Sequence, residues 1–188
     1  MNSLPSQILN VVCHSPASHI KVMTKKLIGK LFAFKFVGRK YDILGVVLDY
    51  NDDWTLIRNC AEYSPDGFTL FKNEKVDHYY GEREKMATKI LKLKKYSYQN
   101  DPKITLASLD EMLSSIDKKY GLIQLDTRKG DASDVVKYLG QADSLYLFDE
   151  LTTTAKWRYK LRLPEKECRF ISFDNNYLNS LKFITKFK

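Results

Sequence analysis

Lysines and tyrosines alternate in one short stretch near the middle of the chain. In order, the stretch contains Lys89, Lys92, Lys94, Lys95, Tyr96 and Tyr98. Ammonium groups neutralise phosphates, and aromatic rings stack on unpaired bases with little regard to sequence. The pattern therefore predicts a basic linker face that binds RNA or another single-stranded nucleic acid. The alternative is that the lysines are solvated and the tyrosines pack across the linker.

Other residue types that could do chemistry lack partners at the required spacing. Cys13, His14 and His19 cluster near the N-terminus, but zinc sites use four protein ligands, or three and a water. Cys60 and Cys168 have no histidine near them in the sequence, and the chain has no Gly-x-Ser-x-Gly elbow or glycine-rich phosphate loop. We therefore expect no metal site, no cofactor, no catalytic residues and a non-enzymatic protein.

Composition narrows the class of partner. The 188 residues carry a formal net charge of +8, and 44% of them are hydrophobic. A basic, core-forming chain favours anionic partners such as nucleic acid, although surface lysines can also serve only to solvate. The three cysteines are few, odd in number and far apart, which indicates a reducing compartment and hence the cytoplasm. No segment approaches the roughly 20 apolar residues that span a bilayer, so we expect no membrane partner.

Residues 27–98 show the pattern of a small β domain. Five short strands are expected at 30–38, 41–50, 54–59, 68–73 and 75–80. The Pro65-Asp66-Gly67 turn precedes the fourth, since proline presets a negative φ and glycine accepts a positive one. Several short strands in a row favour a barrel or sandwich over an α/β sheet. The charged segment that follows Gly81 fits either a short helix or a final strand.

Residues 99–121 are predicted to form a linker with one α-helix. Thr105 is a candidate N-cap, Ser108 with Glu111 forms an alternative capping box, and Gly121 suits the C-terminal end. One helix face gathers Leu109, Met112, Leu113, Ile116 and Tyr120. Such a face is expected to pack into a core or between domains, with a partner groove as the alternative.

The second half, residues 122–188, repeats the layout of the first. Strands are expected at 122–127, 135–142, 144–150, 156–163 and 168–173, followed by a helical turn and a short terminal segment. Trp54 and Val76 lie 22 positions apart, and Leu145 and Cys168 lie 23 apart. Common order and spacing predict a duplication. Residues 1–26 fall outside both copies and are expected to form a loose extension.

Several motifs resemble Sm-like barrels, which have five strongly bent antiparallel strands and are close to the SH3-like shape. They are Gly45-x-x-x-Asp49, Trp54-x-Leu56 and Gly67 with residues 69–76. Residues 27–188 also resemble a group of bacterial proteins with tandem small barrels, through Glu167, Cys168, Ile171, Phe173, Tyr177 and Leu181. The resemblance implies a mainly β fold with two tandem Sm-like/SH3-like five-stranded barrels.

The chain departs from the RNA-binding members of the Sm-like family. Those members carry Asp-x-x-Met-Asn and Arg-Gly motifs, and the corresponding stretches here read DYNDD and FKN. Lys72 and Asn73 stand where those members have the Arg-Gly pair, and they are candidates for contact with the backbone and bases of RNA. Ring assembly needs exposed barrel edges, which a duplication could cover by pairing the two barrels. The resemblance thus supports the fold more than RNA binding.

The leading functional hypothesis is therefore an adaptor that binds a protein partner through barrel surfaces, with nucleic-acid binding as the alternative. Trp54 and Trp157 bear on this choice, because barrels of this shape use exposed aromatic residues to grip peptides. We expect both tryptophans to point into the core.

Overall fold

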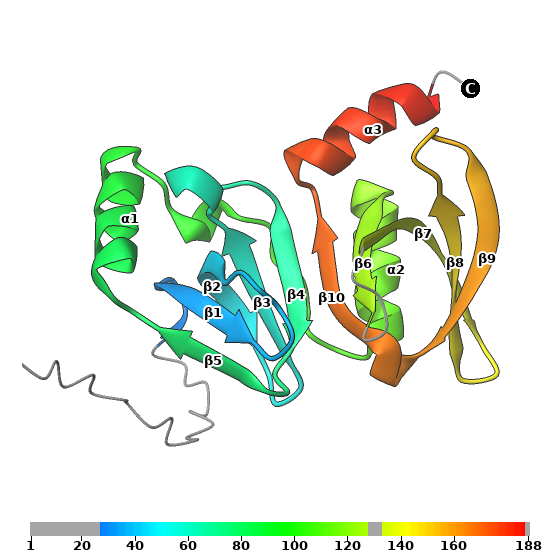
Figure 1. The fold of residues 1–188 in the computed structure, drawn as a ribbon, viewed down its shortest axis with the longest axis horizontal. Coiled ribbons are helices and arrows are strands. Elements are labelled where there is room, and N and C mark those ends of the chain that lie inside the picture. Colours follow the sequence, from blue (N-terminus) through cyan, green and yellow to red (C-terminus); the bar gives the residue numbers. More distant parts are fainter. Residues whose placement is uncertain (1–26, 128–132, 187–188) are drawn as a thin grey trace, which may run out of the picture.

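A computed structural model describes residues 27–127 and 133–186 of the chain (Figure 1). The extension predicted for residues 1–26, including Cys13, His14 and His19, lies outside the described residues.

The described chain is mainly β, with three α-helices. The first half contains β1 (Leu31–Phe36), β2 (Ile43–Tyr50), β3 (Trp54–Asn59), β4 (Phe68–Lys72), β5 (Val76–Tyr79) and α1 (Glu82–Leu93). The second contains α2 (Leu109–Tyr120), β6 (Ile123–Thr127), β7 (Ser133–Ala142), β8 (Leu145–Leu151), β9 (Trp157–Pro164), β10 (Cys168–Phe173) and α3 (Asn176–Lys186). The segment after Gly81, for which the sequence left a helix or a strand open, is a helix, and the C-terminal segment, expected to form a helical turn, is an α-helix of several turns.

The ten strands of the described residues form one antiparallel sheet in the order β5-β1-β2-β3-β4-β10-β6-β7-β8-β9. The first five strands and the last five follow the same order, because β5 pairs with β1 as β10 pairs with β6. Each strand of the second half begins roughly 90 residues after its counterpart in the first. The layout predicted to occur twice therefore has the same strand order in both halves.

The two closed barrels expected from the sequence are not confirmed, because the sheet is open and continuous. β4 does not close onto β5 of its own half; it pairs with β10, with Leu70 opposite Ile171. The hydroxyl oxygens of Thr69 and Ser172 lie 2.8 Å apart across this junction. Ladder hydrogen bonds and a partly buried hydroxyl pair thus join the two halves. The edge-to-edge pairing expected of a duplication is present at this point.

α2 packs into the core at the junction of the two halves. Its N-cap is Ser108, whose hydroxyl accepts the Glu111 N–H while the Glu111 carboxylate accepts the Ser108 N–H. Gly121 ends the helix with a φ of 77°, a conformation that favours glycine. Met112, Leu113 and other residues of its apolar face join residues of β3, β4, β6, β7, β8 and β10 in one buried cluster. The predicted helix and its Ser108 capping box are confirmed, and Thr105 is not the cap.

α1 and α3 follow equivalent strands and cover equivalent parts of the sheet (Figure 1). Ala87 and Leu91 of α1 are buried against β1 and β2, in a cluster with Leu31 and Val46. In the second half, Leu178 of α3 joins a cluster drawn from β7, β8 and the residue before β6. Both faces of β1 therefore carry buried side chains, because Phe34 and Phe36 pack on the opposite side with Phe71 and Phe170.

None of the described helices is long and apolar enough to cross a lipid bilayer.

Candidate functional site

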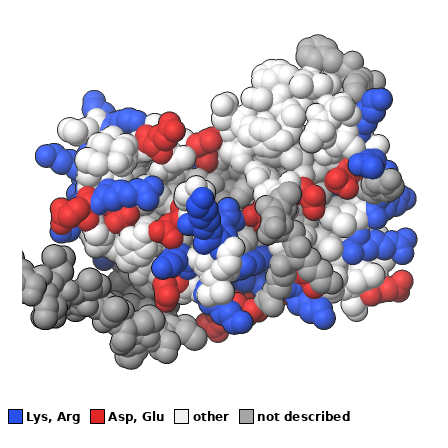
Figure 2. All heavy atoms as spheres, in the orientation of Figure 1, with Lys and Arg blue, Asp and Glu red and all other residues white. Residues whose placement is uncertain are grey.

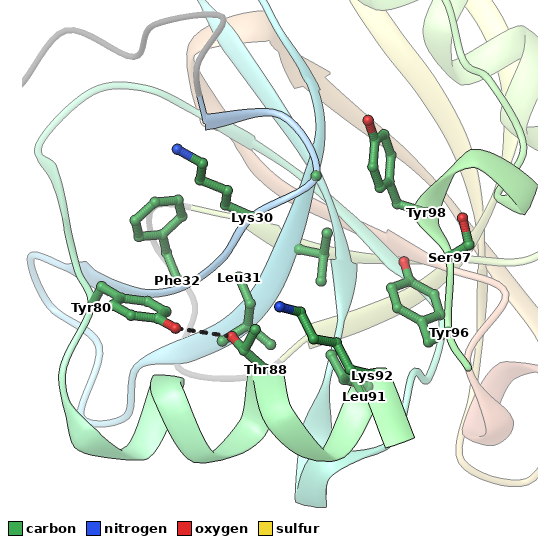
Figure 3. Close-up of a pocket in the computed structure, with 12 residues that line it drawn as sticks. Lys30, Leu31, Phe32, Tyr80, Thr88, Leu91, Lys92, Tyr96, Ser97 and Tyr98 are labelled. Carbon is green, nitrogen blue, oxygen red and sulfur yellow. Dashed lines mark hydrogen bonds between the residues drawn. The ribbon is translucent and has the colours of Figure 1, made fainter. Parts of the chain in front are cut away.

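A hollow of about 720 Å³ opens between α1, the strands β1 and β2, and the segment that follows α1 (Figure 3). This volume is within the usual range for small-ligand sites, roughly 300–1,000 Å³. The described residues that line it are Gly29, Lys30, Leu31, Phe32, Val46, Tyr80, Thr88, Leu91, Lys92, Tyr96, Ser97 and Tyr98. We call this hollow the aromatic pocket.

Aromatic rings stand on two sides of the aromatic pocket. Phe32 and Tyr80 form one wall, with ring centroids 6.1 Å apart, and Tyr96 and Tyr98 form the other (Figure 3). The Tyr80 hydroxyl lies 3.4 Å from the Thr88 hydroxyl, which ties the first wall to α1. The arrangement offers flat apolar faces to a planar ligand, which is the geometry that base stacking uses.

The charged groups of the pocket are cations. Lys30 and Lys92 are exposed at its rim, and the Lys92 side chain reaches across the opening (Figure 3). None of the described lining residues is Asp or Glu. A negatively charged ligand would therefore meet two ammonium groups and no lining carboxylate, so the site is electrostatically suited to an anion.

Tyr98 is held in place by a glycine on the other side of the pocket. A Cβ atom at Gly29 would lie 2.4 Å from the Tyr98 ring, so only glycine allows this approach. Gly29 also has a φ of 78° and donates its N–H to the Val47 carbonyl at 2.8 Å. The position of the Tyr98 ring is thus set by backbone that precedes β1.

Tyr96 is fixed by a polar contact beneath the pocket. Its hydroxyl donates to the Asp101 carboxylate, which lies 3.9 Å from the Arg58 guanidinium. Arg58 in turn stacks over Phe68, 4.3 Å from the ring centroid. Burial and the hydrogen bond to Asp101 raise the pKa of Tyr96. The ring therefore stays neutral at physiological pH and presents one face to the pocket.

The structure brings only some of the sequence-predicted site residues together. Lys92, Tyr96 and Tyr98 line the aromatic pocket, whereas Lys89, Lys94 and Lys95 do not. Lys94 donates to the Tyr63 carbonyl at 3.0 Å and to the Ser64 hydroxyl at 2.7 Å, which ties the end of α1 to the β3–β4 connection. Lys89 and Lys95 are exposed on α1 and just beyond it.

Lys72 and Asn73 lie apart from the pocket and make structural contacts. The Lys72 ammonium pairs with Glu165 at 3.1 Å and sits over the Trp54 ring. The Asn73 amide donates to the Asn51 carbonyl at 2.8 Å, and its oxygen accepts from the Thr55 hydroxyl at 2.6 Å. These bonds join the β2–β3 and β4–β5 turns, so both side chains are already engaged within the fold.

Two residues of the pocket, Phe32 and Tyr80, had no signal in the sequence pattern. They come from the start of β1 and the end of β5, and the pairing of these two strands brings them near α1. The two tryptophans also differ from one another. Trp54 is buried as expected, while Trp157 is 45% exposed and does not point into the core.

The structure also bears on the two other kinds of site considered in the sequence, a nucleophilic cysteine and a metal site. Cys60 and Cys168 are free thiols without exposed surface, and burial raises the pKa of each to about 12. They are therefore weak nucleophiles. In the part of the chain that the structure describes, no group of three or more His, Cys, Asp or Glu side chains could hold a metal ion.

No family model matches the chain, and no curated protein or solved structure shows significant similarity to it.

Proposed function

We propose that each half of the chain is an Sm-like/SH3-like small barrel opened at one side, and that the halves arose by duplication. The repeated strand order and the helix that follows the fifth strand in each half support this proposal. This proposal includes the predicted domain boundaries, with the two barrels at 27–98 and 122–188 and the linker with its helix at 99–121. The buried free thiols of Cys60 and Cys168 also fit a reducing compartment such as the cytoplasm.

We further propose that the protein is a non-enzymatic binder of single-stranded nucleic acid, with the aromatic pocket as its contact site. The observation that carries this proposal is the joint placement of four aromatic rings and two lysines around one hollow without lining acids. A base would stack between the walls, and its phosphates would lie near Lys30 and Lys92. RNA is the first ligand to test, because the net charge of +8 favours polyanions in general.

Fluorescence anisotropy with labelled oligo(U) tests the nucleic-acid proposal. Lys92→Glu should weaken binding by about tenfold and lower its salt dependence. The matched control is Lys85→Glu on the same helix, since Lys85 is exposed and its ion pair is with Glu82, three residues earlier in the helix. Tyr80→Ala should also weaken binding, while Tyr41→Ala, which removes another exposed ring, should not. Equal effects of target and control variants would reject the pocket as the site.

An adaptor role is a second proposal, and a different surface favours it. α3 exposes Tyr177, Phe183 and Ile184, while Leu178 is buried and Leu181 packs against the same cluster. Exposed apolar side chains grouped on one helix are typical of protein contacts. A Phe183→Ser/Ile184→Ser variant should lose a protein partner recovered by cross-linking from cells, and a Met86→Ser/Leu93→Ser variant of α1 serves as the control.

A further inference from the structure

β9 is the last strand of the sheet, and its outer edge has no neighbour in the described chain. It pairs with β8 along one side, from Leu145 opposite Pro164 to Leu151 opposite Trp157. Figure 1 shows β9 at the margin of the second half, on the opposite side of the molecule from α1. The outward N–H and C=O groups of such a strand are available to an added strand.

The residues along β9 alternate between core and solvent. Leu161 and Leu163 pack against the main buried cluster. Because successive side chains in a strand point to opposite faces, Lys160 and Arg162 point away from that core. Both are exposed, as are Lys156 and Arg158 just before them. Figure 2 shows Lys and Arg side chains gathered along the margin where Figure 1 places β9.

Most of the cationic side chains along this edge have no acidic side chain within ion-pair distance in the described residues. In the described chain, no ion pair within 4 Å involves Lys156, Lys160 or Arg162. Asp149 of β8 stands opposite Lys160 in the register and is the acid closest to it along the ladder. The register shift between Asp149 and Leu151 places a bulge before Lys160. The regular part of the edge therefore starts at Lys160 and carries a positive charge.

This charge decides what could pair with the edge. Lysines on edge strands oppose pairing between like edges, so two copies of β9 would repel one another. An extended segment with carboxylates at alternate positions would instead place each acid beside Lys160 or Arg162, where opposite charges on adjacent strands stabilise the pair. Trp157 adds a half-exposed ring beyond the bulge, and tryptophans are frequent anchors in protein contacts.

We propose that the β9 edge binds an extended acidic segment of a partner protein, which adds to the sheet as an eleventh strand. Backbone hydrogen bonds would hold the segment, and Lys160 and Arg162 would select for acids at alternate positions. The inference extends the adaptor role proposed above and uses a surface separate from α3 and from the aromatic pocket.

The probe is a fluorescein-labelled peptide of about nine residues that alternates Glu with Val or Thr, long enough for one strand. Anisotropy should show binding that Lys160→Glu/Arg162→Glu weakens at least about tenfold. The control variant Lys103→Glu/Lys118→Glu changes the net charge equally at exposed sites on the linker and α2, and it should bind as the wild type does. Circular dichroism and thermal unfolding verify that both variants fold.

A second measurement separates strand addition from simple charge attraction and needs no protein variant. N-methylation of alternate peptide residues blocks the hydrogen bonds of one side of a strand. We expect loss of binding for one set of methylated positions and retention for the other. Hydrogen exchange of the backbone amides in 160–163 should also slow when the peptide is bound.

Three outcomes would overturn the proposal. One is peptide affinity that neither methylation pattern changes. Another is equal loss of affinity in the β9 variant and in its charge-matched control. The third is that the β9 variant loses oligo(U) affinity but keeps peptide affinity, which would make this edge a nucleic-acid surface. None of these depends on the α3 variant, so the adaptor role at α3 is judged separately.

Discussion

The carboxylate of Asp66 accepts a hydrogen bond from the backbone N–H of Asn176 at 2.8 Å. Asp66 lies in the turn before β4 in the first half, and Asn176 is the first residue of α3 in the second. Asn175 caps the same helix by accepting the Leu178 N–H at 2.8 Å. An acid placed at a helix N-terminus satisfies a free N–H and opposes the positive end of the helix dipole. The turn at 65–67 thus helps to start a helix in the other half.

Asp66→Ala is expected to lower the free energy of unfolding by about 1 kcal/mol, because it leaves the Asn176 N–H without its acceptor. Asp66→Asn should lose less, since its amide oxygen can still accept while the charge is gone. Urea denaturation followed by circular dichroism measures both. Asp52→Ala, at another exposed turn carboxylate, is the control. A loss as large at Asp52 would contradict the capping role.

Gly67 is expected to tolerate no side chain. It has a φ of 65°, and a Cβ atom there would lie 2.6 Å from the Asn175 Cβ and 2.7 Å from its backbone N. Gly67→Ala should therefore cost about 3 kcal/mol or more, through strain and through displacement of the start of α3. Gly121→Ala is the matched control, because Gly121 has a φ of 77° with nothing within 4 Å of the added Cβ. It should cost about 1 kcal/mol.

Stability is expected to fall at alkaline pH because of the two buried thiols. The pKa of Cys60 and of Cys168 is raised from 9.0 to about 12 by burial. A raised folded-state pKa gives a contribution that is complete below pH 9 and is lost as the pH rises toward 12, since the unfolded thiol ionises first. At pH 10.5 each thiol should cost about 2 kcal/mol relative to neutral pH.

Denaturation of the wild type and of Cys60→Ala at pH 7.5 and pH 10.5 measures this effect. The wild type should lose about 2 kcal/mol more than the variant between the two pH values, because the variant has no thiol to ionise at this position. Tyrosine titration contributes equally to both proteins. Identical pH dependence in the two would show that the Cys60 thiol is not shielded.

Tyr96→Phe separates the structural role of this residue from its role in the pocket. The change removes the hydroxyl bonded to Asp101 and should cost about 1 kcal/mol of stability. It keeps the ring face that lines the pocket, so oligo(U) affinity should stay within about twofold of the wild type. Anisotropy and urea denaturation on the same samples measure the two effects. A large loss of affinity at unchanged stability would mean that the hydroxyl itself contacts the ligand.

Most of the secondary structure could be predicted from local sequence patterns. The predicted strand at 54–59 matches β3, and the one at 168–173 matches β10, because β-branched and aromatic runs bounded by turn residues are typical of strands. The 82–93 segment was ambiguous, since its apolar residues are sparse and its helix is stabilised by burial of Ala87 and Leu91 on the sheet. Its burial depends on tertiary contacts that a local window does not contain.

Local sequence patterns could not predict that the sheet is continuous, because this also depends on contacts between residues far apart in the chain. Both the first and second halves read as units of five strands, and the β4–β10 pair that joins them involves residues about 100 positions apart. Of the site, Lys92, Tyr96 and Tyr98 were found because they are close in sequence. Phe32 and Tyr80 required the β1–β5 pair to bring them together.

The pairing of β4 with β10 sets an order of events during synthesis. Thr69 and Ser172 are separated by 103 positions, so the ribosome must translate that whole interval before β4 acquires its neighbour. Domains fold from the N-terminus as they emerge, at roughly 5–20 residues per second. The nascent first half therefore passes several seconds with a bare strand available to other nascent chains, and slower translation of the interval would lengthen that period.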